Sequence, residues 1–119
     1  MASLDMGLKS YDLTSANIDK YVTKTSSGNY ALGYIKKDGV FIVQYVGRAD
    51  SDVNARLKAH VGEDYTLFKF SYATSPKEAF ETECKNYHDF GGNAKLNNEY
   101  HPDRPNKSSW KCPVCTIYD

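Results

Sequence analysis

The fold is decided by the stretch Gly28-Asn29-Tyr30-Ala31-Leu32-Gly33-Tyr34-Ile35, Lys36-Lys37-Asp38-Gly39, Val40-Phe41-Ile42-Val43-Gln44-Tyr45-Val46. The outer two runs are rich in β-branched and aromatic residues, which favour strands. The Asp-Gly dipeptide between them is a hairpin turn signal. The stretch therefore predicts a β-hairpin, and everything else is placed relative to it.

The turn length sets which residues of the hairpin face each other. A four-residue turn over 36–39 predicts a register in which Tyr30 lies directly opposite Tyr45. A two-residue turn shifts that register, but cross-strand partners still point the same way. With either turn, Tyr30, Tyr34 and Tyr45 are expected on one common face.

A helix, a strand and a second helix are expected after the hairpin. A helix is indicated by Val53, Leu57 and Val61, which recur every four residues, with Asp50 or Ser51 as N-cap.

Alternation over 65–73 then predicts a strand, and Ser75-Pro76-Lys77-Glu78 has the form of a capping box with proline at the first helical position. The second helix is expected to run to Phe90 and to stop at Gly91-Gly92.

This order predicts an α+β fold in which helices flank a small antiparallel three-stranded sheet, with a β-β-α-β-α core. Residues 1–27 are interpreted as a lead-in with a weak helical stretch over 15–22. Residues 28–98 are expected to form the core, and residues 99–119 a C-terminal loop.

Composition limits the class of protein. The chain has 119 residues, 15 Lys+Arg against 15 Asp+Glu, and too many aromatic residues for a disordered tail. Zero net charge argues against a general nucleic-acid coat protein. Because no apolar run could cross a bilayer and the N-terminus lacks a signal pattern, we expect a soluble, intracellular (cytoplasmic) protein without a membrane partner.

Several short motifs follow one another in a fixed order. They are Gly28-Asn29-Tyr30, Tyr45-Val46-Gly47, Arg56 with His60, Ala79-Phe80-Glu81-Thr82-Glu83, and Asn98. In this order the set resembles the GIY-YIG nuclease family, and the resemblance covers roughly Gly28 to Asn98. The chain departs from the family pattern in having Asn29 at a usually aliphatic position and a longer hairpin between the two tyrosines.

The resemblance implies a role for each matched residue. Tyr30 and Tyr45 correspond to the motif tyrosines, Arg56 to the helix arginine, Glu83 to the metal-binding carboxylate and Asn98 to the late asparagine. His60 is an auxiliary candidate. Tyr34 and Asn97 remain rivals of Tyr30 and Asn98.

The chemistry of these residues suits phosphodiester hydrolysis. Mg²⁺, or Mn²⁺, prefers oxygen ligands and can be held by one carboxylate such as Glu83 together with substrate phosphate. Arg56 offers a fork of donors that fits phosphate. Because a tyrosine has a pKa of about 10, it needs the metal or Arg56 to lower that value before it can activate water at neutral pH. Which tyrosine takes the proton is open.

Two functions of different classes follow. The first is a metal-dependent endonuclease, most simply acting on DNA in repair, restriction or mobile-element biology. The second is a catalytically silent nucleic-acid-binding or protein-interaction module. Residues that could contact nucleic acid besides Arg56 are Arg48, Lys58, Lys69 and Arg104. The oligomeric state is open, since cutting both strands of a duplex requires a dimer or two encounters.

The cysteines form a second constellation. Cys84 and His88 are four residues apart on the second predicted helix, and Cys112-Pro113-Val114-Cys115 resembles a zinc knuckle. Together they make a Cys₃His set that could bind a structural Zn²⁺ and hold the C-terminal segment on that helix, with His101 as a spare ligand. The alternative is an ordinary buried thiol and a separate dithiol.

Overall fold

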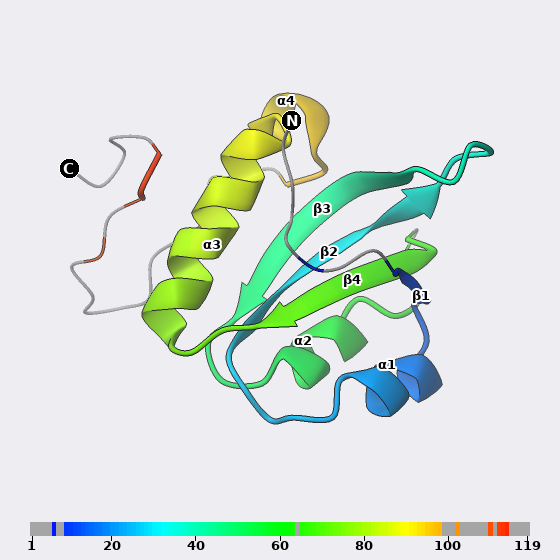
Figure 1. Cartoon of the computed structure of the whole chain (residues 1–119), viewed down its shortest axis with the longest axis horizontal. Helices are drawn as coiled ribbons and strands as arrows, with labels where there is room; N and C mark the ends of the chain where they lie inside the picture. Colours follow the sequence, from blue (N-terminus) through cyan, green and yellow to red (C-terminus); the bar gives the residue numbers. More distant parts are fainter. Residues whose placement is uncertain are drawn as a thin grey trace.

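The computed structural model describes residues 6, 9–63, 65–98, 102, 110 and 112–114. Within them four strands form one antiparallel sheet in the order β1-β4-β2-β3 (Figure 1). The strands are β1 (Tyr11–Asp12), β2 (Gly28–Ile35), β3 (Phe41–Ala49) and β4 (Leu67–Tyr72). The α+β class is confirmed, but the expectation of three strands is wrong. β1 was missed because a two-residue strand leaves no alternating pattern.

Four helices accompany the sheet in the described part of the chain. They are α1 (Ser15–Tyr21), α2 (Val53–Lys58), α3 (Pro76–Asp89) and α4 (Gly92–Lys95). α2 is capped by Asp52, whose side chain accepts from the Ala55 amide, and not by either predicted residue. Because α2 ends at Lys58, Val61 lies outside it.

The start of α3 follows its sequence signal in part. The Ser75 hydroxyl accepts from the Glu78 amide at 3.1 Å, as a capping box predicts. The Glu78 carboxylate returns to Thr74, whose amide and hydroxyl it binds at 3.2 and 2.8 Å. These bonds satisfy donors in the first turn of the helix and just before it, and the helix begins where predicted. At its other end, Phe90 is the C-cap.

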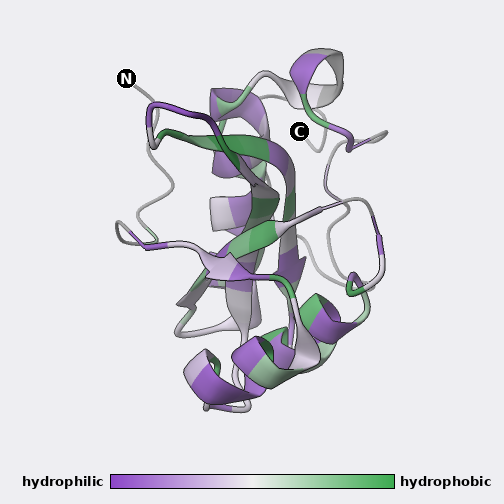
Figure 2. Cartoon of the chain, turned by 90° about the vertical axis from the view of Figure 1, so that its right-hand side faces the viewer, coloured by the Kyte–Doolittle hydropathy of each residue, from purple (hydrophilic) through white to green (hydrophobic). Residues whose placement is uncertain are grey.

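The sheet is covered on both faces. On one face α1 and α2 bury Ile18, Val22 and Leu57 against Tyr30 and Phe68. On the other face α3 and the segment after α4 bury Tyr87 and Leu96 against Ala31 and Val46. Figure 2 shows hydrophobic colour concentrated on the strands, while α1 and α2 alternate between hydrophobic and hydrophilic residues. Residues 11–22, which were interpreted as a lead-in, therefore belong to the same core.

The register expected for a four-residue turn is wrong, whereas the pairing from Gly28 to Leu32 is the one that a two-residue Asp38-Gly39 turn gives. Tyr30 pairs with Gly47, and Tyr45 pairs with Leu32. The loop is one residue longer than expected, since Ile35 pairs with Phe41, and a bulge between Leu32 and Gly33 adds a second one-residue shift. The two one-residue shifts add up to two residues, which is one full period of the alternation of side chains between the faces. Tyr30 and Tyr45 therefore still lie on the same face, as predicted.

Candidate functional site

Tyr30 occupies the centre of the candidate site. It lies in β2, its side chain is fully buried, and its ring lies against the backbone of Gly47 in β3. A Cβ atom at position 47 would be 2.3 Å from Cζ of that ring, closer than real contacts allow. Glycine at this point of the Tyr45-Val46-Gly47 motif is therefore what makes room for Tyr30. Tyr34, its rival, is 40% exposed near the end of the hairpin.

A chain of hydrogen bonds leads from Tyr30 to the surface. Its hydroxyl lies 2.8 Å from Nε2 of His60, and Nδ1 of His60 lies 2.8 Å from Oε1 of Glu63. The four-residue spacing from Arg56 had suggested that His60 lies on the same helix. Instead, α2 ends at Lys58 and His60 lies in the segment that follows it. Gly62, with φ of 96°, belongs to the turn that brings Glu63 back to the imidazole.

Tyr45 packs beside this chain. Its ring centroid lies 6.4 Å from that of Tyr30 in a stacked arrangement, 5.2 Å from that of His60 and 6.1 Å from that of Tyr65. Unlike Tyr30, it is only half-buried. The two motif tyrosines are thus brought together, with His60 in contact with both rings.

The electrostatics of the tyrosines differ from the expectation. Burial raises the pKa of Tyr30 well above its usual value, with a further increase from Tyr45, and the charge of Arg56 only partly opposes this. Burial also raises the pKa of Tyr45, again against the effect of Arg56. Arg56 therefore acts in the predicted direction, but desolvation outweighs it. Both phenols are neutral at physiological pH.

The carboxylate of Glu83 lies on α3 and is buried in an ion pair. Oε1 of Glu83 is 2.7 Å from a terminal nitrogen of Arg48, whose Nε is 2.9 Å from Asp50. The Arg48 guanidinium also lies 5.2 Å from the centroid of the Phe80 ring. Burial raises the pKa of Glu83 and Arg48 works against that rise. Arg48, predicted as a nucleic-acid contact, is thus engaged with two carboxylates.

The two groups of residues lie on opposite faces of β3. Tyr30 pairs with Gly47 and faces α2, whereas Arg48 is the next residue along and faces α3. The charge of Glu83 raises the pKa of both tyrosines, and the charge of the exposed Arg56 lowers the pKa of all three groups. Glu83 and Arg56 thus lie within electrostatic range of both tyrosines.

Asn98, which the resemblance matches to the late asparagine, contacts the backbone of β3. Its side chain is buried and binds the backbone of Val46 twice, accepting from the amide at 3.0 Å and donating to the carbonyl at 2.8 Å. Its neighbour Asn97 donates its backbone N–H to the Gln44 carbonyl at 2.6 Å and its side-chain nitrogen to the Tyr65 hydroxyl. Asn98 therefore holds the free edge of β3.

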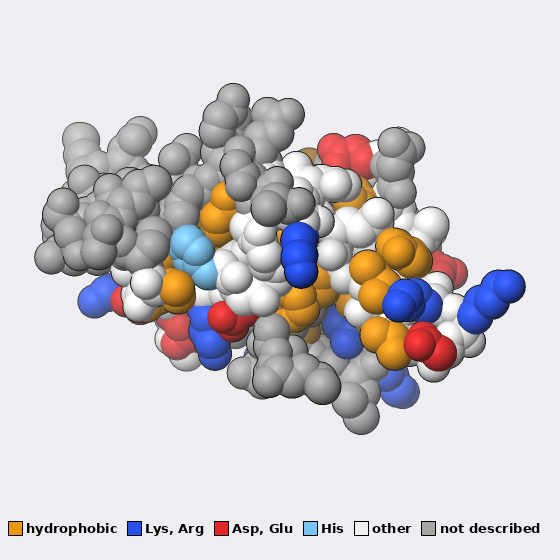
Figure 3. All heavy atoms as spheres, turned by 90° about the horizontal axis from the view of Figure 1, so that it is seen from above, with side chains coloured by type: hydrophobic (Ala, Val, Ile, Leu, Met, Phe, Trp, Pro, Cys, Tyr) orange, Lys and Arg blue, Asp and Glu red, His pale blue; other side chains and the backbone are white. Residues whose placement is uncertain are grey.

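The other predicted contact residues are spread over the surface. Lys58 forms an ion pair with Asp19 at 2.6 Å, and Lys69 lies 5.1 Å from the centroid of the Phe41 ring. Arg104 lies outside the described residues. On the face drawn in Figure 3, the coloured basic and acidic side chains are interspersed.

The structure brings two of the predicted zinc ligands together. Cys84 and Cys112 are buried in one cluster with Phe80, and Trp110 packs against it. Burial, and next the contact with Cys112, raise the pKa of Cys84. Within the described residues no group of three His, Cys, Asp or Glu side chains is arranged to hold a metal. Cys115 and the spare candidate His101 lie outside that part of the chain, and the ring of His88 lies edge-on to Tyr87.

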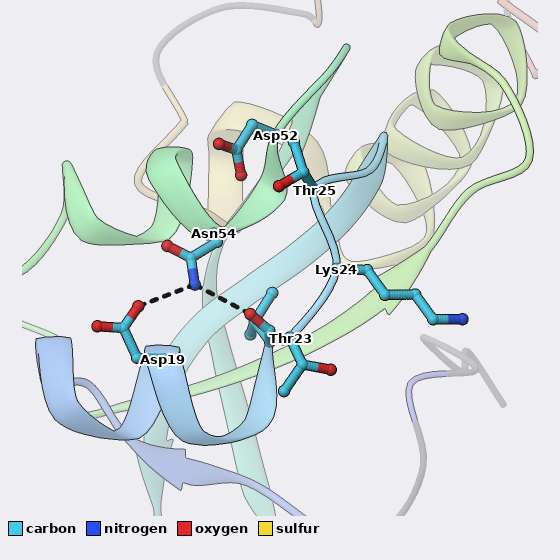
Figure 4. A pocket seen from close by; sticks show the side chains of 7 residues that line it. Asp19, Thr23, Lys24, Thr25, Asp52 and Asn54 are labelled. Carbon is cyan, nitrogen blue, oxygen red and sulfur yellow. Dashed lines mark hydrogen bonds between the residues drawn. The ribbon is translucent and has the colours of Figure 1, made fainter.

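A polar pocket between α1 and α2 has a volume of about 440 Å³ and was not predicted (Figure 4). Asn54 lies in it and donates to Asp19 at 3.2 Å and to the Val22 carbonyl at 2.9 Å. The side chains of Lys24 and Asp52 also line it. Since Asn54 bonds to both the side chain and the C-terminal backbone of α1, its visible role is to join the two helices.

No family model matches the chain, and comparisons with curated proteins and with solved structures find no match.

Proposed function

We propose that this protein is a metal-dependent endonuclease that hydrolyses phosphodiester bonds in DNA, with a site of the GIY-YIG type. The observation that supports this most is that Tyr30, Tyr45, Arg56 and Glu83, which come from four separate elements, lie within electrostatic range of one another. The sequence motif alone did not require these residues to interact. Their mutual effects on pKa are what a shared reaction site would produce.

A divalent cation fits the oxygen chemistry of Glu83. Its Oε1 atom binds Arg48, and among the hydrogen bonds of the described residues none uses Oε2. One carboxylate oxygen is therefore left for a hard ion such as Mg²⁺ or Mn²⁺, which completes its shell with water and substrate phosphate. When bound, the ion would neutralise charge on the phosphate and on the leaving oxygen.

The chain's own residues supply the remaining functions. Arg56 is exposed on α2 and presents a guanidinium that can bind a phosphate oxygen with two parallel hydrogen bonds. Tyr30 and Tyr45 place two hydroxyl-bearing rings beside His60, so water can be oriented and deprotonated there. One such site serves one strand, so a double-strand break would take a second copy or a second encounter.

The alternative is a module that binds nucleic acid or protein without cleaving it. One observation favours it: Arg48 already neutralises Glu83, so the carboxylate is satisfied without a metal. In that case the ion pair is a structural element and binding does not depend on Mg²⁺.

Cleavage assays separate the two functions. The full chain would be incubated with supercoiled plasmid and with branched and single-stranded oligonucleotides, in Mg²⁺, Mn²⁺ or EDTA. We expect metal-dependent cutting that falls at least about 100-fold in Glu83→Gln, because the metal loses its charged ligand. Glu81→Gln, on the same helix, is the matched control and should cut normally. Binding without cutting by the folded wild type would favour the silent module.

A structural zinc ion at Cys84, His88, Cys112 and Cys115 stays a separate proposal. The contact between Cys84 and Cys112, which are far apart in sequence, supports it.

A further inference from the structure

The end of the β2–β3 hairpin projects beyond the four-stranded part of the sheet (Figure 1). β4 pairs with β2 only as far as Gly33, whereas β2 and β3 stay paired as far as Ile35 and Phe41. Residues 34–42, which lie beyond the last pairing with β4, are named the hairpin tip. The hairpin tip is therefore a two-stranded ribbon that stands free of the rest of the sheet.

The hairpin tip combines exposed apolar side chains with two lysines. Six large hydrophobic side chains are exposed in the described residues, and three of them are Tyr34, Ile35 and Val40. Lys36 and Lys37 are exposed too, and neither belongs to an ion pair within the described part of the chain. At the right-hand end of Figure 3, where the hairpin ends, basic and hydrophobic side chains lie side by side.

The turn that joins the two strands is ordered by hydrogen bonds. The Lys36 amide donates to the Val40 carbonyl at 3.0 Å, and the amide of Gly39, with φ of 86°, donates to the Lys36 carbonyl at 2.9 Å. Asp38, the one acidic residue of the hairpin tip, accepts from the Val40 amide at 3.1 Å. Its carboxylate is thus directed at its own turn, and the two lysines give the hairpin tip a net positive charge.

The hairpin tip continues the face of the sheet that carries the candidate site. The bulge lies on β3, so the alternation of β2 is unbroken and Tyr30, Tyr34 and Lys36 share one face. The exposed Arg56 belongs to this face as well, since its charge reaches Tyr30. At about 3.3 Å per residue, Tyr34 lies about 13 Å and Lys36 about 20 Å from Tyr30 along the strand.

We propose that the hairpin tip is a second contact for duplex DNA and enters its major groove about six base pairs from the phosphate at Arg56. The inference rests on the proposed function and deepens it, since it states how the substrate lies on the protein. The major groove is wide enough for a two-stranded ribbon, and about 20 Å corresponds to about six base pairs at about 3.4 Å each. Lys36 and Lys37 bind phosphates beside the groove, while Tyr34 and Val40 contact sugars and thymine methyl groups.

The order of residues along the hairpin tip favours DNA over a lipid surface. Lys36, Lys37 and Asp38 lie at the turn, and the exposed apolar residues lie behind them. A loop that inserts into a bilayer would carry apolar side chains at its leading end, because charged groups are costly there. In a DNA groove the leading end meets phosphates and base edges, where lysines are favourable.

The first test is binding without cleavage. Fluorescence anisotropy is measured with the full chain, without added metal and at several salt concentrations, on a labelled duplex of about two helical turns. We expect Lys36→Gln/Lys37→Gln to bind about 10-fold more weakly and to reduce the salt dependence of log K by about 1.8, since each phosphate contact contributes about 0.9. Lys77→Gln/Lys85→Gln is the matched control, because it removes two exposed lysines from α3, and it should bind like the wild type.

The second test measures where the contact lies. Cutting in Mg²⁺ is followed on duplexes whose arm on one side of the cut is shortened step by step. The rate of the wild type should fall about 10-fold when the arm on that side becomes shorter than about six base pairs. Lys36→Gln/Lys37→Gln should cut duplexes with long and short arms at equal rates, because it has no contact left to lose.

The outcomes distinguish the hairpin tip contact from the nuclease function. Equal loss of duplex binding in the two double variants would overturn the contact, because it would show a general effect of charge. Unchanged binding in Lys36→Gln/Lys37→Gln, with cleavage still lost in Glu83→Gln, would overturn the contact and leave the nuclease standing. Wild type that binds vesicles containing phosphatidylserine but no duplex would also overturn it. Duplex binding that depends on the two lysines, with no cutting, would support the contact and reject the nuclease.

Discussion

Buried polar groups on the two faces of β3 are stabilised in different ways. On the α2 face, Tyr30 and His60 are linked by hydrogen bonds and the phenol stays neutral. On the α3 face, Glu83 is buried as a charged group and depends on Arg48. A buried neutral chain needs only hydrogen bonds, whereas a buried charge needs a counter-charge. The α2 face therefore holds a neutral hydrogen-bonded chain, and the α3 face holds an ion pair.

The largest effect is expected on the α3 side, from the cysteines. If Zn²⁺ joins Cys84 to the C-terminal segment, metal analysis of protein purified without added zinc should give about one zinc per chain. Chelation should then reduce the stability by several kcal/mol, because the metal is bound only in the folded state. Cys115→Ser should lose the metal, while Val114→Ala, an exposed residue between the paired cysteines, should keep it. Zinc well below stoichiometric amounts in the wild type would leave Cys84 as an ordinary buried thiol.

The next largest effect concerns the ion pair. Arg48→Met leaves Glu83 buried without its counter-charge, and we expect a loss of about 3 kcal/mol in the free energy of unfolding near pH 7. Since burial raises the pKa of Glu83, the native variant binds a proton at a higher pH than the unfolded chain does. Its stability should therefore rise as the pH falls through that pKa.

Urea unfolding at several pH values measures this effect. The double variant Arg48→Met/Glu83→Gln is the matched control, and it should regain much of the lost stability because no charge stays buried. If the single variant is as stable as the wild type at every pH, Arg48 does not stabilise the buried Glu83 carboxylate. The proposed difference between the two faces of β3 would then be wrong.

The smallest effect concerns the edge that both faces share. Asn98→Ala removes two hydrogen bonds to the Val46 backbone and should cost about 2 kcal/mol. Asn97→Ala removes one exposed side-chain bond and should change the stability by no more than about 0.5 kcal/mol. Equal losses of stability in the two variants would show that the two hydrogen bonds of the Asn98 side chain make no particular contribution to stability.

Local patterns were enough to predict much of the fold. The hairpin and the start of α3 depend on signals within a few residues, and the structure has both. The prediction of the four-residue-turn register failed because the loop is one residue longer and because the bulge at Leu32/Gly33 has no sequence mark besides a glycine. The strand β1 was not predicted for a related reason, since its two residues form a strand only by pairing with β4.

The candidate site was predicted by its order of motifs and not by its contacts. Tyr30 and Tyr45 pack beside each other, and the charges of Arg56 and Glu83 reach both of them. The link from His60 to Glu63 was missed, although two titratable residues three apart around a glycine are a signal that could have been used. The partner of Glu83 could not be predicted, because Arg48 reaches it only after β3 and α3 have packed.

The hold of Asn97 and Asn98 on β3 has a consequence for assembly. An edge strand normally offers its unpaired amides and carbonyls to any passing chain, and so can extend a sheet from one molecule into the next. Here the outward groups of Gln44 and Val46 are already occupied by residues of the same chain. Two copies cannot join their sheets through this part of β3, so a dimer that cuts both strands of a duplex would have to form through another surface. The same contact makes this edge a poor template for aggregation.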